Sequence, residues 1–216
     1  MPAQELFDIF NADMIPTGEV VAKDKAHRDG LWHQVFHCWV VRPLDDGEAA
    51  ILFQVRSRTK STYAGLLDIS AAGHLSSGEG PLDGIRELEE ELGITCKAED
   101  LIPLGIQKIA TETTGYPNRE FCHTYILQRT EKPADYTLQA EEVDGVMEMR
   151  LSDAFALFSG EVETVSVKGV LTMMGKPVQT TKDVTIKDFV PHFDKYYLKI
   201  MIMIELHLAG SRYLAV

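Results

Sequence analysis

The sequence has few cysteines, fewer basic than acidic residues, and no long apolar run. Its three cysteines, Cys38, Cys96 and Cys122, are widely spaced and form no Cys-x-x-Cys pair. An odd and scattered set of this kind indicates buried, reduced thiols and a reducing compartment. We therefore expect a cytoplasmic protein.

Basic residues are outnumbered: 21 lysines and arginines stand against 33 aspartates and glutamates, a formal net charge of −12. That charge argues against a nucleic-acid backbone or an anionic membrane as the main partner. It is compatible with a phosphorylated substrate, because a basic pocket or a bound cation can reverse the local field. No apolar run approaches the ~18 residues that cross a bilayer, and the N-terminal MPAQELFDIF lacks the basic start of a signal peptide.

What the chain does have is an alternation of β-rich and helical segments. Its 216 residues are 45% hydrophobic, enough for one domain with a sizeable core and some additions. Strands are predicted over 34–43, 48–57, 101–114 and 121–130 (the last two joined by a YPNR turn), a β-hairpin within 161–190, and helices over 82–92, 152–160 and 191–210. Ser152 and Gly160 are the expected caps of the second helix, and Pro191 opens the third. The order of elements favours an α/β fold with a mixed sheet.

The most informative segment is IRELEEELGI, residues 85–94, within the first predicted helix. At about 100° per residue, its apolar and acidic side chains separate onto opposite faces: Ile85, Leu88 and Leu92 against Glu87, Glu90 and Glu91. Like charges at this spacing repel by roughly 0.2–0.5 kcal/mol per pair on an exposed helix. A hard divalent cation, Mg²⁺ or Mn²⁺, would offset that repulsion. Arg86 lies one turn before Glu90 and can hold that carboxylate in position.

Two interpretations of this helix are open. A run of charges most often marks a solvated surface, and on the helix alone that interpretation is the commoner one. The loop before the helix shifts the balance towards a metal site. Its glycines, Gly73, Gly78 and Gly80, permit tight turns and a close approach of the backbone to a ligand.

Loop and helix together resemble the Nudix box, G-x5-E-x7-R-E-U-x-E-E-x-G-U, in which U is a bulky aliphatic residue. Gly73 and Glu79 have the spacing of its first part, and residues 86–94 match its second part completely. Between Glu79 and Arg86 six residues stand where the family has seven, which shifts the loop against the helix. A motif of this length is specific even with one deletion, and the chain is identified as a member of the Nudix family.

Segments outside the box are similar to one branch of that family, which includes type 1 isopentenyl diphosphate isomerase and related hydrolases. The similarity covers about residues 5–155, with a weaker echo at 188–199. It implies an α/β/α sandwich with a mixed β-sheet. We expect a Nudix domain over residues 1–160, and a C-terminal hairpin and helix over 161–216 that pack on the same domain.

The resemblance assigns roles to individual residues. It implies that Glu87, Glu90 and Glu91 bind Mg²⁺ or Mn²⁺, and that Arg56 and Lys60 face a diphosphate. Two cations four residues apart in an acidic protein are plausible phosphate contacts in their own right. Their alternative is an ordinary surface role in solubility.

Further candidate ligands come from the isomerase branch. Glu120 aligns with an isomerase glutamate that takes part in metal binding and catalysis, while Asn118 replaces a neighbouring carboxylate. His27, His33 and His74 align approximately with isomerase metal ligands, and imidazoles suit Zn²⁺ and Mn²⁺. The alternative for these three residues is a set of scattered structural histidines, so their role is open.

The function implied is metal-dependent hydrolysis of a diphosphate linkage in a small molecule, by in-line attack of a metal-activated water. Arg86 would hold the catalytic Glu90 in position. The general base is open among Glu90, Glu91, Glu120 and Glu142, the last of which lies where many Nudix hydrolases carry an additional carboxylate. The alternative for Glu142 is a polar turn before a strand.

Two other functions are weighed against hydrolysis: an isopentenyl-diphosphate-isomerase-like enzyme and a non-catalytic Nudix ligand-binding module. The isomerases carry a catalytic cysteine directly before the Gly-His that is Gly73-His74 here, and this chain has Ala72 at that position. A methyl group neither donates nor accepts a proton, so we expect no isomerisation. The complete set of helix carboxylates disfavours a pure binder, although a fold alone does not establish activity.

The last predicted helix is apolar almost all round, with a stripe of Tyr197, Ile200, Ile204 and Leu208 that Met201 and Met203 widen. A helix of this kind is buried against another apolar surface. That surface is either the domain's own core or the same helix face of a second copy in a homodimer, and the sequence leaves both alternatives open.

Overall fold

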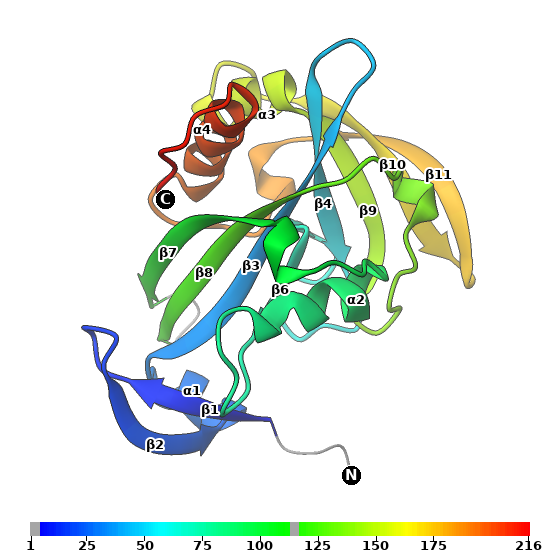
Figure 1. Ribbon diagram of the computed structural model, residues 1–216. Coiled ribbons are helices and arrows are strands. Elements are labelled where there is room, and N and C mark those ends of the chain that lie inside the picture. The colour runs from blue at the N-terminus through cyan, green and yellow to red at the C-terminus, as the bar shows by residue number, and fades with distance from the viewer. Residues whose placement is uncertain (1–4, 113–116) are drawn as a thin grey trace.

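The computed structural model describes residues 5–112 and 117–216. Figure 1 shows a large twisted sheet with helices on both sides and a separate hairpin at one end. The main sheet contains nine strands: β3 (His33–Pro43), β4 (Ala49–Arg56), β5 (Leu67–Asp68), β6 (Ala71–His74), β7 (Leu101–Thr111), β8 (Asn118–Gln128), β9 (Val143–Arg150), β10 (Val165–Met173) and β11 (Lys176–Val184). Their order is β11-β10-β9-β4-β3-β8-β7, with β5 beside β4 and β6 beside β3. The pairs are antiparallel except β3 with β8, so the sheet is mixed, as predicted.

Helices cover both faces of this sheet. The helices α3 (Leu151–Ser159) and α4 (Tyr196–Leu208) lie on one face, and α2 (Arg86–Leu92) lies on the other (Figure 1). The alternation along β3 separates the two cores, because successive side chains of a strand point to opposite faces. Trp39 and Val41 pack in the cluster with α3 and α4, whereas Cys38 and Val40 pack with the side chains of α2. This is the predicted α/β/α sandwich.

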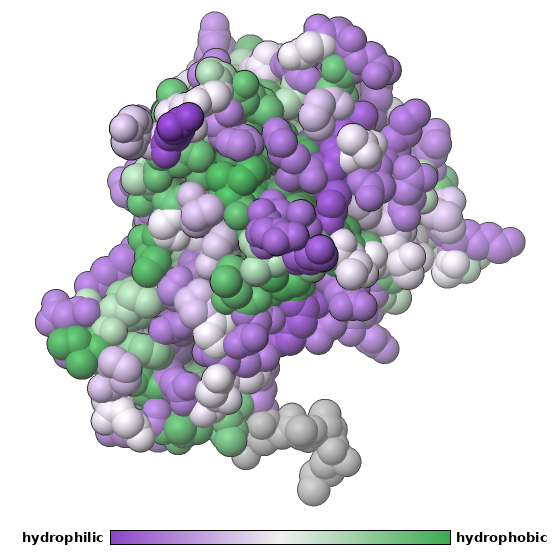
Figure 2. All heavy atoms as spheres, viewed as in Figure 1, coloured by the Kyte–Doolittle hydropathy of each residue, from purple (hydrophilic) through white to green (hydrophobic). Residues whose placement is uncertain are grey.

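The C-terminal helix α4 packs on the chain's own core. Its buried residues are Tyr196, Tyr197, Ile200, Met201 and Ile204, all in the larger core cluster. The domain's own core therefore covers the buried side of this helix, as the first of the two alternatives had it. On the face seen in Figure 2, hydrophobic residues also show between α4 and the strands β7 and β8. A homodimer stays a prediction, as does the division of the chain at residue 160.

Several predicted boundaries are wrong in detail. The N-cap position of α3 is occupied by Arg150, in extended conformation, and not by Ser152. Ser152 lies inside the helix, and its backbone N–H donates to Oε1 of Glu48 at 2.9 Å. The helix α4 begins at Tyr196 and not at Pro191, because Asp194 and Lys195 adopt left-handed backbone conformations, at φ 56° and 53°, that do not continue a right-handed helix. β7 ends at Thr111 and β8 begins at Asn118, so Asn118 and Arg119 of the predicted YPNR turn belong to β8; residues 113–116 lie outside the described part of the chain.

Turns set by glycine follow the prediction. Gly93 and Gly160 end α2 and α3 in the left-handed conformation, at φ 68° and 84°, where a residue without a Cβ atom avoids strain. The predicted hairpin within 161–190 is β10 and β11.

The N-terminal region contains elements that the sequence did not predict. A hairpin of β1 (Leu6–Phe10) and β2 (Pro16–Ala22) precedes the short helix α1 (Lys23–Asp29). The helix is polar, with Ala26 as its one buried residue, so it carries no apolar period. None of the helices in the described residues is long and apolar enough to span a bilayer.

Candidate functional site

The acidic helix α2 meets the sheet at Gly73 on β6. A Cβ atom on residue 73 would lie 2.0 Å from Cδ of Glu87 and 2.1 Å from its Oε1. No side chain can share that space, so glycine is what lets the carboxylate of Glu87 lie against β6. The next residue on that strand is His74. The charge of His74 acts on Glu87, so this carboxylate lies within electrostatic reach of a histidine that the sequence singled out.

Arg86 joins the shortened loop to the helix. Its Nε and Nη2 donate to the two carboxylate oxygens of Glu79 at 2.8 and 3.0 Å. Its Nη1 donates to Glu87 at 2.5 Å and to Glu90 at 3.3 Å. The one-residue deletion therefore leaves a bidentate pair between Glu79 and Arg86, while the predicted contact with Glu90 is the longest of the set. Glu79 anchors the arginine that orients the helix carboxylates.

The three glutamates of α2 (Glu87, Glu90 and Glu91) differ in burial. The side chain of Glu90 is 52% exposed and that of Glu87 12%, and Glu91 is 5% exposed. Glu91 accepts a hydrogen bond from the backbone N–H of Ala72 at 3.1 Å and one from Nε2 of Gln54 at 3.4 Å. Glu91 is thus buried and Glu87 is only partly exposed, which a solvated helix face does not explain.

Burial also changes the acidity of these carboxylates. It raises the pKa of Glu91 to about 8, and the nearby charge of Glu87 adds to the effect. Burial likewise raises the pKa of Glu87, against the opposing charge of Arg86. Paired carboxylates with raised pKa values in one place are typical of a functional site, and a divalent cation would stabilise their ionised forms.

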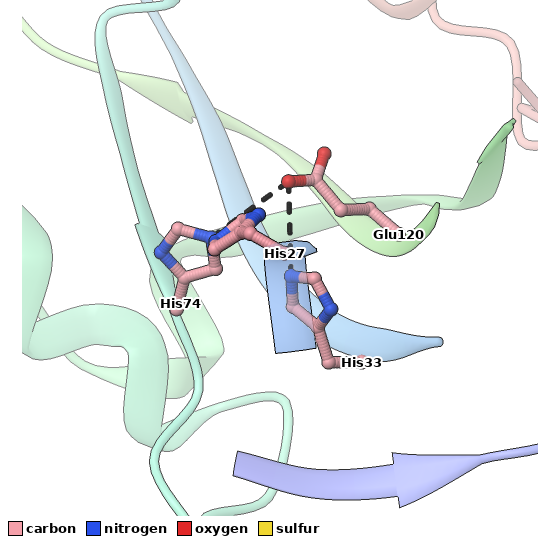
Figure 3. A group of neighbouring side chains, drawn as sticks. All are labelled: His27, His33, His74 and Glu120. Carbon is pink, nitrogen blue, oxygen red and sulfur yellow. Dashed lines mark ion pairs between the residues drawn. The ribbon is translucent and has the colours of Figure 1, made fainter. Parts of the chain in front are cut away.

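Three histidines and a glutamate form a second cluster beside this helix (Figure 3). The members of this histidine cluster are His27 of α1, His33 of β3, His74 of β6 and Glu120 of β8, and one ligand atom from each lies within 4.8 Å of all the others. Oε1 of Glu120 is 3.8 Å from Nε2 of His33 and 3.7 Å from Nε2 of His74. The structure therefore brings together three histidines whose roles the sequence left open.

The electrostatics of the histidine cluster suit a metal ion. Burial is the largest cause that lowers the pKa of His33 to about 4 and that of His27 below its ordinary value. Burial alone would raise the pKa of Glu120, but the neighbouring His74, 3.7 Å away, outweighs it and lowers that pKa to about 2. Neutral imidazoles next to an ionised carboxylate are the forms that bind a cation. The Nε2 atoms of His33 and His74 are buried and have no hydrogen-bond partner among the described residues, as expected of atoms that face an ion.

The unpredicted N-terminal hairpin holds this cluster in place. Phe7 of β1 is fully buried, and its ring stacks on His33 at 5.0 Å and on His74 at 4.8 Å between ring centroids. His27 comes from α1, directly after the hairpin. Sequence periodicity gives no sign of this arrangement. The alignment of the histidines with the isomerases is the signal that pointed to it.

The two cations expected to face a diphosphate each contact a carboxylate. Nη1 of Arg56 donates to Oδ2 of Asp68 at 2.9 Å, and Lys60 forms an ion pair with Glu142. Burial lowers the pKa of Lys60, the charge of Arg56 adds to this, and the charge of Glu91 opposes it. Lys60 therefore lies within electrostatic reach of α2, and Glu142, a candidate base, lies against a lysine.

His37 is a buried polar residue without a role in the sequence motif. It is 4% exposed, and its Nδ1 lies 3.0 Å from the hydroxyl of Tyr196 on α4. Burial lowers its pKa to about 4, and His192 contributes to the shift. Across the pairing of β3 with β6 it stands opposite Ala72, the position of the isomerases' cysteine. No pattern of residue types near position 37 distinguishes it from a core histidine.

A comparison with protein families matches the NUDIX domain to residues 34–165 of this chain. A Nudix hydrolase of Clostridium acetobutylicum, itself described as uncharacterized, is 36% identical over 195 residues, which cover 90% of this chain and 94% of that protein. The isopentenyl-diphosphate Delta-isomerase of Clavibacter sepedonicus is 31% identical over 99 residues, 45% of this chain and 50% of the isomerase. Both comparisons agree with the branch that the sequence indicated.

Among solved structures, DR0079 from Deinococcus radiodurans is similar with a TM-score of 0.53 and 22% identity. The match covers 72% of this chain and 90% of that one. At this level of identity the similarity concerns the fold, which is the α/β arrangement described above.

Proposed function

Since the chain belongs to the Nudix hydrolase family, we propose that it hydrolyses a diphosphate linkage in a small-molecule substrate with the aid of a divalent metal ion. One observation carries the proposal. Glu87 of α2 lies against Gly73 and within electrostatic reach of His74 of the histidine cluster. The two sets of potential metal ligands therefore act on each other electrostatically, and Glu87 and Glu91 also lie within electrostatic reach of the cation Lys60.

The side chains at this place fit a divalent ion. The glutamates of α2 offer the oxygen ligands that Mg²⁺ and Mn²⁺ prefer, and the histidine cluster offers a mixed nitrogen and oxygen set that suits Mn²⁺ or Zn²⁺. The buried Nε2 atoms of His33 and His74 support such a role because they have no other partner among the described residues. When bound, the ion neutralises diphosphate oxygens and lowers the pKa of a coordinated water.

We assign the proton acceptor to Glu90 among the four candidates. Glu91 has a pKa raised to about 8, so without a cation it holds a proton near neutral pH. Glu142 contacts Lys60, and Glu120 faces the histidines. Glu90 is half-exposed, with Arg86 as its 3.3 Å neighbour. In the reaction a water oxygen bonds to phosphorus, the bridging P–O bond breaks, and the water proton passes to Glu90.

Arg56 and Lys60 are the proposed diphosphate contacts. Each is paired with a carboxylate, Asp68 and Glu142 respectively, so neither is a free surface cation. Arg56 has donors to share between Asp68 and a phosphate, because a guanidinium carries five N–H groups in a planar fork. Lys60 has three donors on one nitrogen and can bridge Glu142 to a phosphate oxygen in the same way.

Isomerisation is the second candidate, favoured by the similarity to isopentenyl-diphosphate Delta-isomerases. Against it stands Ala72 at the position of the isomerases' cysteine, because a methyl group can neither donate nor accept a proton. A non-catalytic binding module is a third candidate, and the retained α2 glutamates with their ordered Arg86 argue against it. We further propose that the enzyme acts in the cytoplasm on a small molecule, without nucleic acid or membrane as partner.

The experiment that tests the proposal is a hydrolysis assay with Mg²⁺ or Mn²⁺, in which the phosphomonoester products are separated and any free phosphate is measured. The panel comprises nucleotide sugars, dinucleoside polyphosphates, coenzyme derivatives and prenyl diphosphates. We expect metal-dependent turnover of at least one member, abolished by EDTA. Binding of panel members without any turnover would instead favour the binding module.

A further inference from the structure

We propose that His192, acting through Asp68, is a positioning residue for Arg56, so that the C-terminal segment completes the diphosphate-binding part of the site. The inference rests on the proposed function, because it takes Arg56 as a diphosphate contact. His192 lies outside residues 34–165, the part of the chain that the family model matches. The role is therefore assigned from the contacts of this structure.

The segment that carries His192 follows a fixed path along β5. The backbone N–H of Val190 donates to the carbonyl of Leu67 at 2.8 Å, and Leu67 forms a parallel bridge with Phe189. Phe189 is 2% exposed and packs edge-on against Phe53 at 5.2 Å between ring centroids. The hydroxyl of Tyr197 donates to the carbonyl of Val190 at 2.9 Å. These contacts place the following residues beside Asp68.

Asp68 is the buried carboxylate that links the two ends of this arrangement. Its side chain is 8% exposed; Oδ1 accepts from the backbone N–H of Ile69 at 2.9 Å and lies 3.4 Å from Nε2 of His192. Its Oδ2 accepts from Nη1 of Arg56 at 2.9 Å. Burial alone would raise the pKa of Asp68, but the hydrogen bond from His192 and the charges of His192 and Arg56 hold it below its ordinary value. An ionised carboxylate buried in this way depends on its partners.

Arg56 has one short contact and two long ones. Apart from the bond to Asp68, its Nε and Nη2 lie 3.4 and 3.3 Å from the carbonyl oxygen of Thr62. The side chain is 21% exposed. With Nη1 fixed by Asp68, the rest of the guanidinium fork is left in a defined orientation for a phosphate. Binding is tighter when such a group is ordered before the ligand arrives.

Loss of the His192 contact leaves Oδ1 of Asp68 held, among the described residues, by the backbone N–H of Ile69 alone, and it loosens the orientation of Arg56. In the described part of the chain, no hydrogen bond or ion pair joins His192 to the α2 glutamates or to the histidine cluster, so the groups assigned to chemistry remain in place. The effect should therefore appear in substrate binding and not in the chemical step. A changed KM with an unchanged kcat distinguishes a positioning role from general structural damage.

The test is calorimetric binding of inorganic pyrophosphate with Mg²⁺, measured beside KM and kcat for the best panel substrate. His192→Ala should weaken pyrophosphate binding and raise KM about tenfold, the size of one lost hydrogen bond to a charged group, with kcat within about threefold. His192→Gln keeps a side-chain N–H donor and should restore most of the binding. His207→Ala, near the end of α4, is the matched control and should bind like the wild type.

If His192→Ala fails to fold, Asp68→Asn takes its place, since it keeps the volume and removes the charge; it should weaken pyrophosphate binding at least tenfold. Wild-type pyrophosphate affinity in His192→Ala or Asp68→Asn would overturn the positioning role and leave the hydrolase proposal standing. A wild-type enzyme that neither binds pyrophosphate nor hydrolyses any panel member would overturn both.

Discussion

Glu87 occupies the space that a side chain on Gly73 would need, with its Cδ 2.0 Å from the position of that missing Cβ. The constraint is one of space, because Gly73 is not among the glycines with a positive φ. A strand residue thus decides where a helix carboxylate lies. Because residue 73 has no side chain, Glu87 lies against β6 and within electrostatic reach of His74.

Gly73→Ala should therefore displace Glu87 and impair catalysis. The atoms that must move are the carboxylate end of a flexible side chain, so kcat should fall while the melting temperature changes little. Differential scanning calorimetry and the hydrolysis assay measure both. Gly80→Ala is the matched control, since a Cβ there would meet its nearest atom, Oδ2 of Asp83, at an ordinary 3.7 Å. Wild-type kcat in Gly73→Ala would disprove the importance of the Glu87 position.

Mn²⁺ should raise the melting temperature, because a ligand that binds only the native state stabilises that state. His33→Ala together with His74→Ala should remove part of that gain and should abolish one of the Mn²⁺ sites seen in a calorimetric titration. Glu90→Gln together with Glu91→Gln should remove the part that depends on α2. Identical Mn²⁺ titrations for the wild type and the histidine double variant would mean that these residues are structural.

The raised pKa of Glu91 should make the free energy of unfolding depend on pH when no metal is bound. Its pKa rises from an ordinary 4.5 in the unfolded chain to about 8 in the native protein. The stability that the group contributes is thus fully present below the unfolded value and is lost as the pH rises through the folded value. Glu91→Gln does not titrate, so its melting temperature in EDTA should exceed that of the wild type by a margin that grows between about pH 5 and pH 8.

The exposed Glu89→Gln is the matched control for this pH series, since it lies on the same helix. Its difference from the wild type should stay nearly constant over the same range. A constant margin for Glu91→Gln as well would show that the carboxyl of Glu91 is not forced towards its protonated form by burial.

The protein should not isomerise isopentenyl diphosphate. Moving the double bond requires a proton added at one carbon and removed at another, and the methyl group of Ala72 can do neither. Incubation in D₂O with Mg²⁺ or Mn²⁺, followed by NMR, should show no deuterium uptake beyond the rate without enzyme. Catalytic formation of deuterated dimethylallyl diphosphate would mean that another group, such as the nearby His37, replaces the cysteine.

The sequence predicted most of the central fold because the relevant signals are local. Gly93 and Gly160 mark helix ends through their freedom at positive φ, and the alternation along β3 and β4 marks strands with two buried faces. The N-terminal hairpin was not predicted. Val20 and most of β2 are exposed, so that strand lacks the alternation of apolar and polar residues that a buried face would give it.

The site was predictable where a motif is contiguous and unpredictable where it depends on contacts between distant elements. The α2 glutamates and Arg86 belong to one helix, and their types and spacing are visible in the sequence. The meeting of His27, His74 and Glu120 requires α1, β6 and β8 to come together in space. The link from His192 to Asp68 spans 124 positions and belongs to no motif, so only the fold reveals it.

The measurement that tests the account most directly compares Glu90→Gln with the wild type in hydrolysis of the best diphosphate substrate, with circular dichroism as a check on folding. Loss of a group that acts in proton transfer or metal binding should lower kcat by at least ~10²-fold while the spectrum is unchanged. The half-exposed position of Glu90 makes an intact fold the expected outcome. Wild-type turnover in this variant would contradict the account and would place catalysis outside the acidic helix.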